Sequence, residues 1–287
     1  MTSRLDAHVH LWNRALDPQD WIDPETMAPI DQDFGTGELA TMLAETGMDK
    51  AIVVQASNSV DESIRLAQSD PTVVAGLVAW VDLTQDVGPQ LERILATASV
   101  PIVGVRHLAH IDPDPAWLLR EDVARGLNAL EQAGLCFDLV LRHWQLSQAA
   151  HVASRHQGLR LVLDHLGGPP PPDTDATAWE SGFRDLAGLP NVVAKVSGLT
   201  SGLVPGSWTS SDLRPVVETA LEVFGPERLM YGTDWPLAEL GGGAGIWKTA
   251  LETLLKGASE DAYDRLFGTT AVEVYLQQNP DGQPAAR

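Results

Sequence analysis

The chain has 287 residues, of which 44% are hydrophobic and 20% are charged, as in an ordinary folded globular protein. Its formal net charge of −20 disfavours binding to nucleic acid and to anionic membrane surfaces, because like charges repel. No apolar run approaches the roughly 18 residues of a membrane span, and polar residues interrupt the N-terminal segment where a signal peptide would be continuously apolar, so we expect a cytoplasmic protein.

Eight short apolar segments are spaced along the chain. Several consist almost entirely of hydrophobic residues, which is typical of parallel strands buried on both faces. These predicted strands span residues 4–12, 50–57, 73–83, 100–108, 136–143, 160–167, 191–199 and 229–236. Segments with apolar residues at helical spacing alternate with them: 38–47, 60–69, 88–99, 121–134, 146–157, 179–189, 211–225, a stretch after the eighth strand, and 259–277. This alternation predicts an α/β fold, a (β/α)8 TIM barrel that forms a single domain over residues 1–287.

Polar residues gather at the C-terminal ends of the predicted strands, where barrel enzymes have their active sites. They are Asp6, His8, His10, Arg106, His107, Arg142, His143, Asp164, His165, Lys195, Ser197 and Asp234. Their repetition at the same end of so many strands indicates an active site rather than packing.

His8 and His10 are two residues apart on the first strand, so both side chains point to the same side. We expect them to face the barrel lumen, with the helices faced by Ala7, Val9 and Leu11. Two imidazoles held in this way can ligate a divalent metal or bind an oxyanion. Strands one and eight are neighbours in a closed barrel, so Asp234 can approach the pair, accept a proton from water and contact a metal. The alternative is that Asp234 caps the turn before Pro236.

Nine motifs of the chain occur in the same order as in a known family. They are DAHVHLW (6–12), WIDPETMAPIDQDF (21–34), VVQAS, GLVAWVDL, VGVRHL (103–108), FDLVLR, LVLDHLG (161–167), NVVAKVSGL (191–199) and MYGTDWP (230–236). On these motifs the chain resembles the amidohydrolase superfamily, within the branch of metal-dependent hydrolases that contains sugar aldonolactonases and 2-pyrone-4,6-dicarboxylate lactonase. The segment 21–34 most resembles aldonolactonases that act on fucono- and rhamnono-lactones.

The resemblance implies a catalytic centre. Zinc or another single divalent metal would be held by His8, His10, His165 and Asp234. Some members of the branch, however, hydrolyse lactones without a metal. Asp234 would be the general base that activates water, and His165 would complete the catalytic group. Binuclear sites in the superfamily usually include a carboxylated lysine on strand four, which has no lysine here, so we expect at most one metal.

Four residues are expected to contact the substrate. Arg106 and His107 would bind its oxygens by the same resemblance, and Lys195 lies in the matching strand-seven segment. Trp12 follows the first strand, where an indole can line a sugar pocket or pack.

Two positions depart from the family pattern. The family often continues D-H-x-G with Lys-Pro, where this chain has Gly168 and Pro169. Strand five often ends in Arg-Pro, where this chain has Arg142 and His143, so His143 is either a substrate contact or an ordinary loop histidine. We expect the surface to carry His110, His151 and His156. We expect the single cysteine, Cys136, to be buried and to pack in the interior, and the glycine-rich residues 241–245 to form a mobile rim of the pocket.

The sequence therefore predicts a hydrolase that opens a small lactone, derived from a sugar acid. Two alternatives stay open: a metal-dependent decarboxylase or amide hydrolase on the same barrel, and a non-catalytic ligand-binding barrel. No apolar stripe identifies an oligomeric interface.

Overall fold

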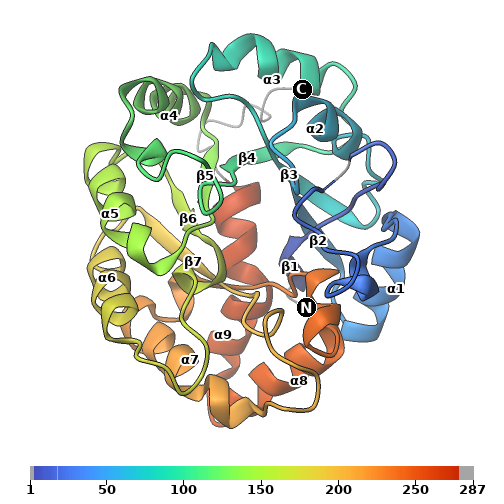
Figure 1. The fold of residues 1–287 in the computed structure, drawn as a ribbon, viewed down its shortest axis with the longest axis vertical. Coiled ribbons are helices and arrows are strands. Elements are labelled where there is room, and N and C mark those ends of the chain that lie inside the picture. The colour runs from blue at the N-terminus through green and yellow to red at the C-terminus, as the bar shows by residue number, and fades with distance from the viewer. Residues whose placement is uncertain (1–2, 18, 278–287) are drawn as a thin grey trace.

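The computed structural model describes residues 3–17 and 19–277, and its strands form the predicted barrel (Figure 1). Residues 1–2, 18 and 278–287 of the predicted domain lie outside these described residues. Eight strands pair in parallel and in chain order, each inside its predicted segment. They are β1 (Leu5–Val9), β2 (Lys50–Val54), β3 (Val74–Ala79), β4 (Ile102–His107), β5 (Cys136–Leu139), β6 (Leu161–Leu163), β7 (Val192–Val196) and β8 (Leu229–Tyr231).

A ring of helices surrounds these strands (Figure 1). Its members are α1 (Thr36–Thr46), α2 (Val60–Leu66), α3 (Val87–Leu95), α4 (Glu121–Ala133), α5 (Leu146–Arg155), α6 (Thr177–Ala187), α7 (Ser210–Phe224) and α8 (Ala244–Leu254). Gly134 ends α4 in the left-handed conformation with φ 67°, which glycine adopts without a steric penalty. In the described chain, no helix is both long and apolar enough to span a membrane.

The barrel closes through the segment that follows β8. Residues Val9 and Trp235 form an isolated parallel bridge, and the Trp235 carbonyl accepts a 2.7 Å hydrogen bond from the His10 amide. The Asp234 amide donates to the His8 carbonyl at 2.9 Å. The predicted approach of Asp234 to the two histidines is therefore fixed by backbone hydrogen bonds.

The register of β1 differs from strict alternation. Its pairing with β2 shifts between Asp6 and Val9. Ala7 consequently packs in the inner apolar cluster, beside Ile52 and Val54 of β2, and does not face the helices as predicted. Val9 and Leu11 belong to the outer cluster between strands and helices, in agreement with the prediction.

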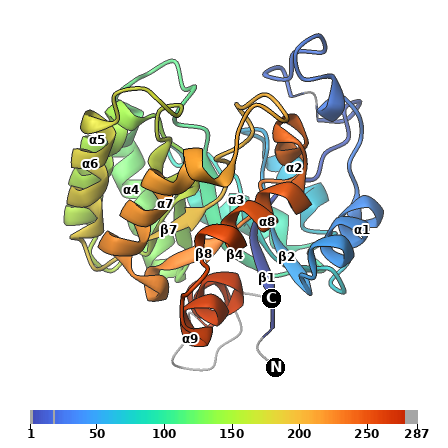
Figure 2. The same cartoon turned by 90° about the horizontal axis from the view of Figure 1, so that it is seen from below.

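The C-terminal segment closes the barrel at the N-terminal ends of the strands. The predicted helix 259–277 is a short α9 (Glu260–Asp264) followed by two π-helical segments, Arg265–Thr269 and Val272–Leu276. Figure 2 shows α9 beneath the strands, and Val274 and Tyr275 pack into the inner apolar cluster. With this end filled, access to the lumen is from the C-terminal ends of the strands.

Candidate active site

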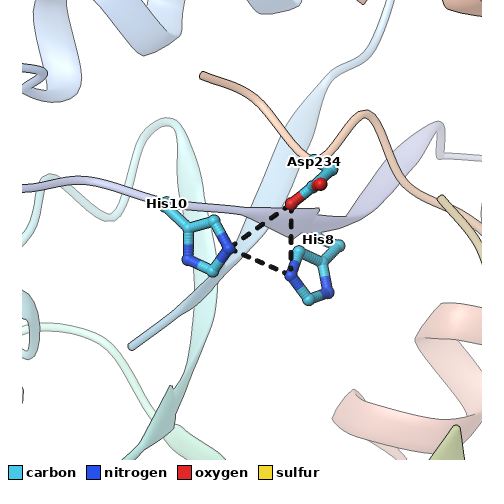
Figure 3. Close-up of side chains that lie close together, drawn as sticks. All are labelled: His8, His10 and Asp234. Atoms are coloured by element: carbon cyan, nitrogen blue, oxygen red, sulfur yellow. Dashed lines mark hydrogen bonds and ion pairs between the residues drawn. The ribbon is translucent and has the colours of Figure 1, made fainter. Parts of the chain in front are cut away.

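His8, His10 and Asp234 meet at the closing seam of the barrel. The two Nε2 atoms of His8 and His10 are 3.1 Å apart. Asp234 Oδ1 lies 3.7 Å from Nε2 of His8 and 3.4 Å from Nε2 of His10. Figure 3 shows the three side chains converging, with His8 from β1, His10 from the residue after it and the carboxylate from the segment after β8. Asp234 has φ 60°, a left-handed conformation that turns its side chain out of the strand direction.

The hydrogen bonds of His10 fix the direction of its lone pair. Its Nδ1 lies 2.7 Å from the carbonyl oxygen of Val54, which only accepts hydrogen bonds, so Nδ1 carries the proton and Nε2 is unprotonated. Burial lowers the pKa of His10 to about 3 and that of His8 well below its usual range. Both imidazoles are therefore neutral at pH 7, the state that ligates metals.

The geometry of this cluster fits one divalent ion. Tetrahedral ligands at about 2.0–2.1 Å from zinc lie about 3.3 Å from one another, close to the 3.1, 3.4 and 3.7 Å observed between these three atoms. Asp234 Oδ1 is also buried without a hydrogen-bond partner among the described residues. A buried carboxylate oxygen is costly unless a cation or a donor binds it, so His8, His10 and Asp234 are suited to hold a metal.

His165 lies close by but belongs to a different group of potential ligands. Its ring centroid is 4.6 Å from that of His8, and it groups with His8 and Asp164 rather than with His10 and Asp234. Asp164 is already bound by Lys195 Nζ at 3.0 Å and by Arg106 Nη1 at 3.0 Å. Because these two cations oppose a metal ion at Asp164, the site offers room for a single metal.

A cavity of about 450 Å³ opens above the cluster. The residues that line it are His10, Trp21, Met27, Ala56, Arg106, Leu108, His110, Ile111, Val140, Leu141, Arg142, His165, Gly168, Gly198, Ser201, Gly202, Asp234, Leu237 and Leu240. Four of the predicted site residues thus line the same cavity: His10, Arg106, His165 and Asp234. His8 lies directly below them, fully buried.

Arg106 reaches the cavity from β4 and is held in place by its neighbours. Its Nη2 donates to the carbonyl of Gln55, and its Nη1 lies 3.0 Å from Asp164 Oδ2 and 3.4 Å from His8 Nε2. Only 3% of Arg106 is exposed, so the guanidinium is a fixed positive group beside the metal-binding cluster. This position agrees with a contact to substrate oxygens.

Two predicted substrate contacts lie behind the cavity wall. The indole of Trp12 donates to the carbonyl of Gln32 at 2.8 Å and stacks on His10 at a centroid distance of 6.3 Å. His107 stacks on Trp117 at 3.7 Å, and its Nε2 lies 2.8 Å from Asp112. Neither lines the cavity, because packing partners already occupy both rings, so direct contact with substrate stays a prediction.

Lys195 is fully buried and does not line the cavity, so its contact with substrate stays a prediction. Its Nζ lies 3.1 Å from His8 Nδ1 and 2.6 Å from Asp138 Oδ2. The hydroxyl of Tyr275 donates to the same Asp138 oxygen at 2.8 Å. Burial raises the pKa of Asp138 to about 6 although Lys195 lowers it. His8 Nδ1 also lies 3.2 Å from Asp164 Oδ1, which accepts the Nδ1 proton and leaves Nε2 free to bind a metal. Lys195 therefore supports Asp138 and Asp164, and the acid within the otherwise apolar residues FDLV was the sequence signal for Asp138.

Several other predictions change at the cavity rim. His110, predicted at the surface, lines the cavity, and His156 is only 5% exposed, whereas His151 is exposed as predicted. His143 packs edge-on against Trp144 and is not among the lining residues. The glycine-rich residues 241–245 do not line the cavity either.

Electrostatics keep Asp234 available as a base. Burial raises its pKa to about 6, while electrostatic interactions with His165, Arg106 and Lys195 limit the rise. The carboxylate is consequently mostly ionised at pH 7, with a pKa close enough to neutrality for proton transfer in both directions.

Comparisons with known proteins agree with this site. A model of the amidohydrolase family matches residues 5–276. L-Fucono-1,5-lactonase from Burkholderia ambifaria is 31% identical over 301 residues, covering 100% of both chains. A crystal structure of an amidohydrolase from Burkholderia multivorans with bound HEPES has a TM-score of 0.87 at 30% identity, covering 95% of this chain and 99% of that one. A second one with bound zinc has a TM-score of 0.85 at 31% identity, with the same coverage.

These matches confirm the predicted family and hydrolase class, and they set aside the alternative of a non-catalytic barrel. The match spans the barrel from β1 to the closing C-terminal segment. The chain belongs to the amidohydrolase family.

Proposed function

We propose that this protein hydrolyses a small lactone derived from a sugar acid. The observation that carries the proposal is the convergence of His8, His10 and Asp234 at the floor of an open cavity. The similarity to L-fucono-1,5-lactonase over the whole chain supports a fuconolactone-type substrate. A cytoplasmic location and a role in carbohydrate metabolism belong to the same proposal.

We assign the metal to His8, His10 and Asp234, and we propose zinc. Two imidazole nitrogens and one carboxylate oxygen are ligands that zinc commonly takes, with a further position left for water or substrate. The zinc-bound relative from Burkholderia multivorans supports this choice. When bound, the ion would supply Lewis acidity that polarises the ester carbonyl and lowers the pKa of water.

The residues of the chain account for the proton transfers. Asp234 accepts a proton from a water molecule as the water oxygen attacks the acyl carbon of the lactone. Arg106 and His165, which face the same cavity, are placed to stabilise the negative charge that develops on the carbonyl oxygen. When the ring C–O bond breaks, Asp234 returns the proton to the leaving alkoxide, giving the open hydroxy acid.

A panel of substrates tests this function. We expect the purified protein to release acid, measured with a pH indicator, from at least one aldono-1,5-lactone or aldono-1,4-lactone. An aromatic-pathway lactone, an amide and an aromatic carboxylate that can lose CO2 serve as comparisons for the other reactions on this barrel. Turnover of the amide or the carboxylate, without turnover of any lactone, would overturn the proposal.

A further inference from the structure

His110 and Arg142 stand on one wall of the cavity and have no place in the chemistry described above. His110 lies in the segment after β4, and Arg142 lies in the segment after β5. Because β4 and β5 are paired neighbours, the two segments leave the barrel side by side, and both residues line the cavity.

His110 carries a polar atom without a partner. Its Nδ1 is buried and forms no hydrogen bond with the described residues. Leaving such a buried group unpaired is unfavourable, and a ligand in the cavity would supply the missing bond. Burial lowers the pKa of His110 to about 3, with smaller contributions from Arg106 and Arg142. The neutral ring offers one donor and one acceptor.

The Arg142 guanidinium is also free of protein partners. Within the described chain it has no ion pair or side-chain hydrogen bond, although the protein is strongly acidic. Other arginines, such as Arg120 and Arg184, are paired with carboxylates. Arg106 is paired with Asp164 and the Gln55 carbonyl, whereas no side-chain donor of Arg142 has a protein partner among the described residues.

The opposite wall of the cavity is apolar. It is formed by Trp21 and Met27 from the segment after β1, and by Leu237 and Leu240 from the segment after β8. In an eight-stranded barrel, β1 and β8 lie across the lumen from β4 and β5. Above His10 and Asp234, a ligand held between these walls meets the donors of His110 and Arg142 on one side and Trp21, Met27, Leu237 and Leu240 on the other.

We propose that His110 and Arg142 form a distal pair that binds ring hydroxyl groups of the lactone, away from the scissile ester. A hydroxyl both donates and accepts, which matches the neutral imidazole of His110 and the donors of Arg142. A carboxylate only accepts hydrogen bonds, so it could pair with the N–H of the His110 ring but would leave the unprotonated ring nitrogen without a donor. The inference rests on the proposed function and names what selects the substrate: hydroxyl groups on the ring.

The test compares two six-membered lactones, an aldono-1,5-lactone and δ-valerolactone, which lacks the ring hydroxyls. The measured quantity is the ratio of their kcat/KM values in the wild type and in the variants His110→Leu and Arg142→Met. We expect the ratio to fall about tenfold or more in each variant, through a higher KM for the aldonolactone, because a lost hydrogen bond weakens only the hydroxylated substrate.

Matched controls come from the same chain. His151→Leu removes an exposed histidine of α5, and Arg160→Met removes an exposed arginine that precedes β6, at the opposite end of the barrel. Neither should change the ratio. The distal pair is refuted if His110→Leu and Arg142→Met leave the ratio unchanged, or lower both kcat/KM values equally.

A binding measurement separates this inference from the proposed function. The thermal shift caused by a sugar aldonate, the expected product class, is recorded for the wild type and both variants. If the wild type hydrolyses no lactone but is stabilised by the aldonate, and the variants are not, the proposed function fails and the distal pair stands. If no aldonate stabilises an inactive wild type, both fail.

Discussion

Asp164 and Asp234 both lie next to His8 in buried positions, but their surroundings shift their pKa values in opposite directions. Burial alone raises the pKa of a carboxyl group, and at Asp164 it is outweighed by Lys195, His8 and Arg106, which bring the pKa well below its usual range. At Asp234 burial outweighs the effects of His165, Arg106 and Lys195 and raises the pKa to about 6. Asp164 is therefore a permanently charged anchor for its neighbours, and Asp234 is the carboxylate able to exchange a proton.

Glu62 allows the effect of a buried acid on stability to be measured away from the catalytic centre. Its carboxylate accepts hydrogen bonds from the amides of Ala56 and Ser57, yet burial raises its pKa from 4.5 to about 7. Between these values the unfolded chain loses the proton first, so wild-type stability falls as the pH rises. Relative to Glu62→Gln, we expect the wild type to lose up to about 3 kcal/mol between pH 4.5 and pH 8.

Urea unfolding of both proteins across this range checks the prediction. A difference in unfolding free energy that does not depend on pH would show that Glu62 titrates alike in the folded and unfolded chains. A wild type that gains stability with rising pH would show that the two amide hydrogen bonds outweigh burial.

At the scale of elements, the loop after β7 determines where His165 lies. Gly198 has φ 66°, and a β-carbon there would lie 2.4 Å from His165 Nδ1, the atom that lies 2.9 Å from Ser197 Oγ. We expect Gly198→Ala to displace the His165 ring and to reduce kcat about tenfold or more, since small displacements of catalytic groups carry large costs.

Gly206→Ala is the matched control for this substitution. Gly206 has a similar φ of 78°, but a β-carbon there would have no neighbour within 4 Å. Both variants carry the backbone cost of a left-handed alanine, on the order of 1 kcal/mol, so only Gly198→Ala should lose activity. Equal kcat values for the two would mean that the position of His165 does not matter for turnover.

The positions of strands and helices are predictable from the sequence where hydrophobic patterning determines them. All eight strands fall inside predicted segments, because both-face burial leaves a continuous apolar signal. The C-terminal segment is different, since its pattern is helical throughout but two π-helical segments fit Tyr275 into the barrel floor. That outcome depends on tertiary packing against the inner cluster, which no local pattern contains.

The same contrast holds for the site. His8, His10 and Asp234 are predictable, because strand alternation and barrel closure bring them together. His110 is not, because it follows β4 in an irregular segment whose path is set by its surroundings. Lys195 shows a third case: its strand is predictable from the sequence, but its depth in the lumen, where Nζ binds Asp138 and Asp164, is not.

At the scale of the whole molecule, binding of a metal at the seam should stabilise the fold. A ligand that binds the folded chain shifts the unfolding equilibrium by mass action, and His8, His10 and Asp234 join β1 to the segment after β8. We expect zinc to raise the melting temperature of chelator-treated protein. The shift should be absent in His10→Ala and present in His151→Ala, and a zinc shift that survives in His10→Ala would place the ion elsewhere.

The most direct test of the account is the turnover of Asp234→Asn on the best lactone of the panel. Asparagine tolerates the left-handed backbone at this position, and Asp173→Asn, at an exposed aspartate with φ 63°, is the matched control. We predict that kcat falls about 100-fold to 10,000-fold in Asp234→Asn, with the melting temperature retained and the control unaffected. A kcat for Asp234→Asn close to that of the wild type would contradict the account.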